Sequence, residues 1–218
     1  MICPKLKPTE PDIVSNHMSF LATLRRIAEN STPGRAPSYI EAQTMKALEI
    51  ASEAPIGRAA LGRRLGLGEG VVRTLVRHMR AERLIEVTPQ GIGVAEAGRA
   101  LLDEMRMRIS GGVELPGSPD AVGAHNYAVL VHGASARVRL GVEQRDAALM
   151  AGARGATTAV YRGGVFLVPG LGRPLDAALG GELKALSPRE GSVAIIGSGD
   201  SPMEAEIGAK AAALRLLG

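Results

Sequence analysis

Residues 66–85 contain the feature that most constrains the fold, a helix-turn-helix pattern. Apolar residues recur there at the i, i+3, i+4 and i+7 spacing of one helix face: Val72, Leu75, Val76 and Met79. A shorter helix is expected over residues 58–65, and residues 66–68 (Gly-Leu-Gly) supply the tight turn between the two helices. The pattern predicts a helix over residues 68–81 that buries one face and leaves the other in solvent.

The solvent face of this predicted helix is basic. Residues 57–83 contain seven arginines and two glutamates, a local excess of five positive charges, whereas the whole chain carries only +4. Neutralising a DNA phosphate releases counterions, so a local excess of this kind is typical of nucleic-acid binding. The alternative is a solvated helix face whose arginines pair with Glu69 or Glu82. Together with the turn, the charge favours a recognition helix in the major groove of duplex DNA.

Nine residues are candidates for contact with DNA. Arg73 and Arg77 are assigned to base edges, because a guanidinium can donate two hydrogen bonds to guanine O6 and N7. Thr74 is assigned to a thymine methyl or a phosphate, and Gln90 to the minor groove or flanking phosphates. Arg58, Arg63 and Arg64 are assigned to the DNA backbone. The set is completed by two further residues of the predicted recognition helix, His78 and Arg80.

The flanking segments complete a winged-helix domain over residues 38–109. Ser38 and Glu41 have capping-box spacing, which predicts that a helix begins at Ser38. Two short strands are expected over residues 84–88 and 92–94, joined by Pro89-Gln90-Gly91, and a last helix over residues 95–109.

This segment resembles the winged-helix family at large, through the stretches LGLGEGVVRTLVRHM, RLIEV, PQG and AEAGRALL. Two residues depart from the usual pattern. Arg83 stands where many relatives have a helix-ending glycine, which implies a left-handed backbone with a strain of about 1 kcal/mol. Ala95 replaces the usual hydroxyl at the start of the last helix, at a similar cost of about 1 kcal/mol.

Residues 1–37 are expected to form a tail and one helix. The tail covers residues 1–11, and the helix covers residues 12–29, with Ile13, Phe20, Leu24 and Ile27 near one side. Prolines and a glycine within residues 31–37 then break the helix. This helix is either a dimerisation arm or a cap on the next domain.

Residues 110–124 are rich in glycine and proline and are expected to be a linker. In residues 125–218, strands are expected over 127–131, 138–142, 157–162, 165–168 and 192–196, and helices over 145–151, 175–186 and 201–218. Ser201, Pro202 and Glu204 form a helix-start signature. Hairpins mixed with helices predict an α+β domain with a mixed or antiparallel sheet, so the whole chain is classed as α+β.

The two-domain arrangement resembles a family of archaeal proteins of unassigned function, in which a winged helix precedes a small α+β domain. The residues that carry the resemblance are IGR at 56–58, LGLGEGVVRT at 65–74, QRD at 144–146, GARGATT at 152–158 and AEIGAKAAA at 205–213. The resemblance implies the layout of a transcription regulator and names neither a ligand nor a target.

Polar residues beside glycine-rich turns make a candidate effector site in the second domain: Gln144, Arg145, Asp146, Thr157 and Thr158. The alternative is that they only hold a hairpin and its strands together. Residues 197–199 (Gly-Ser-Gly) superficially resemble a phosphate loop, but Asp200, Glu204 and Glu206 place negative charge beside it, so a dinucleotide site is rejected.

Composition narrows the remaining classes. One cysteine and four histidines without ligand-like spacing predict neither a disulfide framework nor a metal site. The sequence has no run of about 18 apolar residues and no signal peptide, so a cytoplasmic protein without a membrane segment is expected. Only three Asn and three Gln among abundant arginines are typical of a thermophile, although a GC-rich genome also favours arginine.

The sequence therefore predicts a transcription regulator that binds double-stranded DNA as a homodimer, with a C-terminal domain for an effector or for assembly. No cofactor and no catalytic residue is assigned, because no nucleophile is seen beside a base. Two alternatives stay open: a small-molecule enzyme domain fused to a regulatory winged helix, and a winged-helix adaptor that binds protein.

Overall fold

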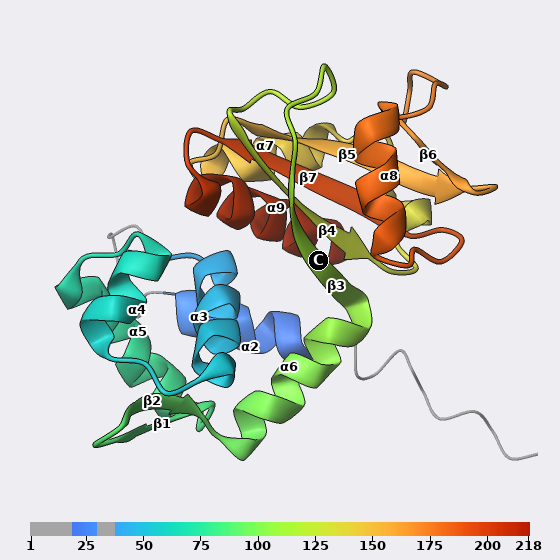
Figure 1. The fold of residues 1–218 in the computed structure, drawn as a ribbon. Helices are drawn as coiled ribbons and strands as arrows, with labels where there is room; N and C mark the ends of the chain where they lie inside the picture. Colours follow the sequence, from blue (N-terminus) through green and yellow to red (C-terminus); the bar gives the residue numbers. More distant parts are fainter. Residues whose placement is uncertain (1–18, 30–37) are drawn as a thin grey trace, which may run out of the picture.

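The computed structural model describes residues 19–29 and 38–218. The first domain contains α2 (Ser19–Ala28), α3 (Glu41–Glu53), α4 (Arg58–Leu65), α5 (Glu69–Ala81), β1 (Ile85–Thr88), β2 (Gly91–Val94) and α6 (Glu96–Arg108). β1 and β2 form an antiparallel hairpin that projects from the helices as a wing (Figure 1). The predicted winged helix is therefore confirmed.

The recognition helix and its ends follow the sequence pattern. The predicted apolar face of α5 is buried, and Gly68 is its N-cap. Arg83 adopts φ +58°, so it carries the left-handed conformation expected where relatives have glycine. Ala95 is the N-cap of α6 and offers no side-chain hydrogen bond, also as predicted.

The predicted helix start at Ser38 is wrong. Ile40 is the N-cap of α3, and its N–H donates to the Gln43 side chain at 3.1 Å. The physical reason is Tyr39, whose ring is buried and whose hydroxyl donates to the Ile27 carbonyl at 2.8 Å. This contact fixes Tyr39 against α2, so the helix begins after it.

Helix α2 is a cap on the first domain within the described residues. Phe20, Leu24 and Ile27 are buried in the core shared with α3, α5 and α6. Residues 1–18 and 30–37, which include Ile13, the predicted tail and the predicted helix break, lie outside the described residues.

The second domain is an antiparallel sheet covered by helices on both faces (Figure 1). Its elements are β3 (Ile109–Leu115), β4 (His125–Val131), the 3-10 turn η1 (Ser135–Arg137), α7 (Val142–Met150), β5 (Gly155–Arg162), β6 (Val165–Leu167), α8 (Ala177–Ala185), β7 (Val193–Gly199) and α9 (Pro202–Leu217). The strand order is β3-β4-β7-β5-β6, and every neighbouring pair is antiparallel. The predicted α+β class is confirmed.

Alternate residues of the central strands point to opposite faces of the sheet. Val129, Val193 and Ile195 are buried with α7 and α9, whereas Leu130 and Ile196 are buried with α8. This double coverage explains why β7 is buried along its whole length.

Small residues let α9 approach the sheet closely. A Cβ at Gly197 of β7 would overlap the backbone of Ala205 and Ala209 of α9. Ser201 caps this helix by accepting the Glu204 N–H at 3.3 Å, and Pro202 follows as its first residue, so the predicted start of the helix is confirmed. Gly197, Ser198 and Gly199 are the last residues of β7 and do not form a loop.

The predicted linker is wrong in its first half. Ile109–Leu115 form β3, an edge strand that continues directly from α6 and pairs with β4 (Figure 1). The register shifts between Ser110 and Val113, and Gly111 has φ +73°. The two glycines at 111 and 112 therefore form a β-bulge. Glycine suits the irregular backbone of a bulge as well as that of a flexible linker, so the composition alone did not distinguish the two.

The strand predicted over residues 138–142 is also wrong. This segment lacks regular structure until α7 begins at Val142, where Gly141 adopts φ +80°. Leu140 is 65% exposed and Val142 is 42% exposed, so their alternation does not mark a buried strand face. The other predicted strands and helices of this domain are present, with ends that differ by a few residues.

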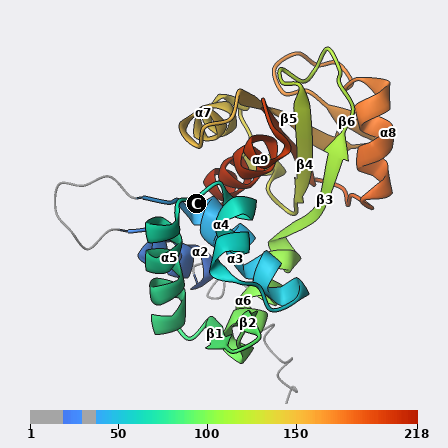
Figure 2. The same ribbon diagram turned by 60° about the vertical axis from the view of Figure 1, so that its left-hand side comes forward.

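Helix α9 joins the two domains. One cluster of buried apolar residues runs from α2 and α3 through α9 into the sheet. In Figure 2, α9 lies between α3 and the strands. Four charged side chains meet at this contact, Lys46 and Glu49 from α3 and Glu206 and Lys210 from α9. The domains are thus joined by a shared core, and α6 runs directly into β3.

Candidate nucleic-acid interface

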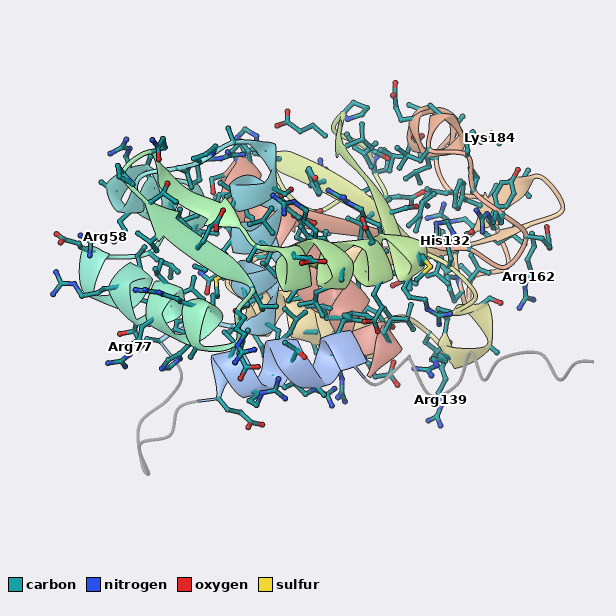
Figure 3. The ribbon with its side chains drawn as sticks, turned by 90° about the horizontal axis from the view of Figure 1, so that it is seen from below. Arg58, Arg77, His132, Arg139, Arg162 and Lys184 are labelled. Atoms are coloured by element: carbon teal, nitrogen blue, oxygen red, sulfur yellow. The ribbon has the colours of Figure 1, made fainter. Side chains whose placement is uncertain are left out.

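The solvent face of α5 forms one wall of an arginine-lined groove. The groove has a volume of about 590 Å³ and lies between α5, the start of α4 and the wing. Its lining residues are Arg58, Arg73, Val76, Arg77, Arg80, Ala81 and Val87. Figure 3 shows Arg58 and Arg77 together at one end of the molecule. The fold therefore gathers four of the nine candidate residues on one surface.

The two carboxylates near these arginines, Glu69 and Glu82, pair with different arginines. Glu82 accepts two hydrogen bonds from Arg26 of α2, at 2.8 and 2.6 Å. This hydrogen bonding lowers the pKa of the Glu82 carboxyl and raises the pKa of Arg26. Glu69 pairs with Arg73 at 3.1 Å, with both side chains mostly exposed. Within the described residues, Arg77 and Arg80 form no ion pair.

The other candidates on the first domain are spread around the groove. Arg63 and Arg64 are exposed on α4, and Arg64 pairs with Glu53 at 2.9 Å. Thr74 donates to the Gly70 carbonyl at 3.2 Å. Gln90 is exposed at the tip of the wing.

His78 does not line this groove and contacts α2 and Tyr39 instead, so its assignment to DNA has no support from the structure. Its Nδ1 lies 2.6 Å from the Tyr39 hydroxyl and 3.4 Å from the Ile27 carbonyl oxygen. The reason is helical geometry, because His78 follows Arg77 by about 100° around α5 and so faces α2. Val87 was missed. It is 49% exposed on the wing and lines the groove, but its sequence context resembles that of any strand residue.

The five candidates for an effector site do not come together. Arg145 and Asp146 pair with each other on the surface at 3.0 Å. Gln144 and Thr158 are buried, and Gln144 Oε1 and Thr158 Oγ1 have no hydrogen-bond partner among the described residues. Thr157 donates to the Asp120 carbonyl at 2.6 Å. Residues that follow one another on α7 point in different directions, so Gln144, Arg145 and Asp146 do not face one common site.

Asp146 instead lines a cavity of about 650 Å³ between the two domains. The cavity walls come from α2, α3, α7 and α9, and they carry Arg25 and Arg215 opposite Glu41, Glu143 and Asp146. Its mixed charges give it no clear preference for an anion or a cation.

A hydrogen-bonded chain in the second domain was missed. His132 Nε2 lies 2.5 Å from Ser110 Oγ, and its Nδ1 lies 3.1 Å from Ser192 Oγ. No such serine–histidine contact was named from the sequence. The three residues come from the start of β3, the end of β4 and the start of β7, and no local motif links such distant positions.

Two negative findings apply to residues 19–29 and 38–218. No helix there is both long and apolar enough to cross a membrane. No group of three or more His, Cys, Asp or Glu side chains there is arranged to hold a metal ion.

Comparisons with known proteins match the two domains separately. Residues 45–109 match a family model described as the CggR N-terminal DNA binding domain. Residues 122–216 match a model described as a domain of unknown function, DUF4443. Two matches in this order support the two-domain layout. No curated protein matches the chain.

A solved structure shares the fold. It is a hypothetical protein from Pyrococcus horikoshii OT3, with a TM-score of 0.64 and 23% sequence identity. The alignment covers 80% of this chain and 91% of that chain. A likeness of this kind across both domains supports the winged helix followed by the α+β domain.

Proposed function

We propose that this protein is a transcription regulator that binds duplex DNA through α5 and the wing. The observation that carries the proposal is the groove in which four arginines gather without a buried carboxylate among its lining residues. The match of residues 45–109 to a DNA binding domain supports the same partner. Exposed guanidinium groups with little internal pairing are available for phosphates and base edges.

In this proposal Arg73 and Arg77 contact bases. They lie one helical turn apart on the exposed face of α5, at a rise of about 6 Å, which is close to two base-pair steps of about 3.4 Å. Arg73 has to leave Glu69, but an exposed pair of this kind contributes only about 0–1 kcal/mol. Arg58, Arg80 and Gln90 then contact phosphates on either side.

The test begins with selection of genomic DNA fragments by the purified full-length protein. Binding of a selected duplex is then measured by fluorescence anisotropy at several salt concentrations. We expect the double variant Arg73→Ala, Arg77→Ala to lose sequence preference. Arg106→Ala is the matched control, because Arg106 is an exposed arginine of α6 that pairs with Asp103, away from the groove. Equal binding by the double variant and the parent would contradict the proposal.

The same titration separates the adaptor alternative. Binding to DNA through phosphates weakens steeply as salt rises, because released counterions favour dissociation. A winged helix that binds protein needs no such dependence. Absence of salt-dependent duplex binding therefore favours the adaptor.

The second domain, in our proposal, senses a ligand or supports assembly and performs no catalytic turnover. The Ser110–His132 pair is the one observation that favours an enzyme. Its third member is the Ser192 hydroxyl, which cannot stabilise an imidazolium as a carboxylate does. Burial, together with Arg189 and Arg108, lowers the pKa of His132, so the charged form that proton uptake would create is disfavoured.

A fluorophosphonate probe decides between these two roles. It reacts covalently with activated serine hydroxyls. We expect no labelling of the native full-length protein, and the variant Ser110→Ala is the control. Labelling that disappears in Ser110→Ala would instead establish an active nucleophile.

We further propose that the regulator acts as a homodimer, because one winged helix reads only a short half-site. The described part of α2 is occupied in the core, so the second domain is the proposed source of the contact. Sedimentation with and without DNA tests this, and a monomer in both conditions at micromolar concentration would contradict it.

A further inference from the structure

The far end of the second domain gathers cations that the DNA-binding proposal does not use. Figure 3 shows His132, Arg139, Arg162 and Lys184 at the end of the molecule opposite Arg58 and Arg77. Three further arginines adjoin this group: Arg108 and Arg189 lie near His132, and Arg137 lies near Arg108. The lowered pKa of His132 disfavours its charged form. Across the described residues, none of the other six side chains forms an ion pair, whereas many arginines elsewhere do. This end therefore carries uncompensated positive charge.

A cavity of about 280 Å³ opens in this region between the segment that follows β4 and the β5–β6 hairpin. Its polar side chains are Ser135, Arg139 and Arg162, and no carboxylate lines it. The walls are otherwise apolar or backbone, with Val138, Val160 and Leu167 on one part and a glycine-containing loop on another. Both guanidinium groups are hydrogen-bond donors without acceptor capacity, so the cavity is suited to an acceptor-rich anion.

A glycine-containing loop forms part of the cavity wall. Gly170 and Gly172 adopt φ +77° and +64°, and both line the cavity. Glu190, in the turn before β7, accepts the N–H of Gly163 in the β5–β6 turn at 3.2 Å.

The adjoining cluster adds to the positive potential. A Cβ at Gly191 would lie 3.2 Å from Ser135 Oγ, which places the turn before β7 against the cavity wall. The same turn holds Ser192, whose hydroxyl accepts the Arg189 N–H at 2.9 Å. That hydroxyl can then donate to His132 Nδ1, which leaves Nε2–H to donate to Ser110.

Arg108 is the least satisfied of these cations. Its Nε atom is buried and has no hydrogen-bond partner among the described residues. Burial and the charge of Arg137 both lower the pKa of Arg108. A group of like charges held this close is stabilised by an anion from outside the chain.

We propose that the cavity lined by Ser135, Arg139 and Arg162 binds a small molecule through a phosphate group. Arg139 and Arg162 donate to the phosphate oxygens, Ser135 donates a further hydrogen bond, and the apolar wall contacts the rest of the molecule. Phosphate is preferred over a single carboxylate because it presents acceptors to donors on several sides and carries more charge. A cavity near the lower end of the ligand-site range, about 300 Å³, suits a small metabolite better than a duplex backbone.

The position of the cavity connects it with the first domain. Arg137, two residues before Arg139, donates to the Leu217 carbonyl at the end of α9. His132 N–H donates to the Arg108 carbonyl, at the end of α6, at 2.9 Å. A ligand that orders this segment thus acts next to both helices that join the domains. Only this regulatory consequence rests on the proposed DNA-binding function; the phosphate site does not.

The test titrates the full-length protein with inorganic phosphate and with pyrophosphate, at constant ionic strength against chloride. We expect saturable binding by calorimetry and a matching rise in melting temperature. Arg139→Gln and Arg162→Gln should each weaken binding about tenfold or more, because each removes charged hydrogen bonds. Lys184→Gln is the matched control, a cation at the same end that does not line the cavity.

Three outcomes overturn the proposal. The first is no saturable binding above chloride, and the second is an equal loss in Lys184→Gln. The third is binding of short random duplex DNA that depends on Arg139 and Arg162 while free phosphates do not bind, because the phosphate source is then nucleic acid. The variant Arg73→Ala, Arg77→Ala must keep phosphate binding, so failure of the DNA proposal stays distinguishable.

Discussion

Two groups of charged side chains in this protein have opposite environments. On α5, Arg77 and Arg80 are exposed and have no ion pair among the described residues. At the α3–α9 contact, Lys46 and Lys210 are buried and each meets a glutamate, with Lys46 2.7 Å from Glu206. Exposed charge without a partner is available for a ligand, whereas buried charge has to be compensated within the fold. The first group therefore serves binding and the second serves the joint between domains.

The largest expected effect comes from removing one buried cation. Lys210→Met removes the ammonium group that contacts both Glu49 and Glu206, so the free energy of unfolding should fall by about 3–5 kcal/mol. Urea unfolding of the full-length protein measures this. The control is Arg80→Met on the exposed group, which should change stability by less than about 0.5 kcal/mol. Equal losses of stability in both variants would contradict the proposed difference between the buried and the exposed charges.

The next effect concerns DNA affinity. Arg77→Ala should cost about 1–3 kcal/mol of discrimination at one base pair and leave the melting temperature unchanged. Arg63→Ala and Arg64→Ala should instead lower affinity for all sequences and reduce the salt slope by about one each. Anisotropy titrations with matched and mismatched duplexes give both quantities. An unchanged salt slope in Arg63→Ala would remove that residue from the interface.

Acid should weaken the buried group, whereas the exposed arginines keep their charge. Burial alone would raise the pKa of Glu206, but Lys210 and Lys46 outweigh it and hold the pKa below its usual 4.5. A lowered folded-state pKa contributes stability above pH 4.5, and that contribution is lost as pH falls through the lowered value. The free energy of unfolding, measured from pH 7 to pH 3, should therefore decline below pH 4.5 less steeply in Glu206→Gln.

The stability contribution of Lys210 has the opposite pH dependence, because it is lost as the pH rises. Burial lowers its pKa, but the charges of Glu49 and Glu206 raise the pKa by more than burial lowers it, so the folded-state pKa lies above 10.5. The contribution of this ammonium is complete below pH 10.5 and is lost only as the pH rises beyond the raised value. A loss of stability at neutral pH would contradict this assignment.

The smallest expected effect concerns Arg83, whose backbone is in the left-handed conformation. Arg83→Gly removes a side chain from a left-handed position, so it should stabilise the domain by up to about 1 kcal/mol. Thermal unfolding measures the gain. DNA affinity should change only by the loss of one exposed charge, and a large loss of affinity would show that Arg83 itself belongs to the interface.

The sequence by itself determined the winged helix and most of the candidate DNA surface. The apolar spacing of α5, the turn at Pro89-Gln90-Gly91 and the cap of α9 are local patterns, set by neighbours within a few residues. Arg73, Arg77 and Arg80 could be named for the same reason, because helix periodicity fixes which side of α5 is exposed. The contact of His78 with Tyr39 could not be predicted from a local pattern, since the two residues are 39 positions apart.

Only the tertiary structure decided the remaining contacts. Lys210 and Glu49 are 161 residues apart, and His132 and Ser192 are 60 residues apart. The glycines at 111 and 112 look like a linker in sequence, and strand pairing alone makes them a bulge. The physical reason is that such contacts depend on which strands pair and which helix covers them. Those choices follow from burial of the whole chain, and no local pattern of residues records them.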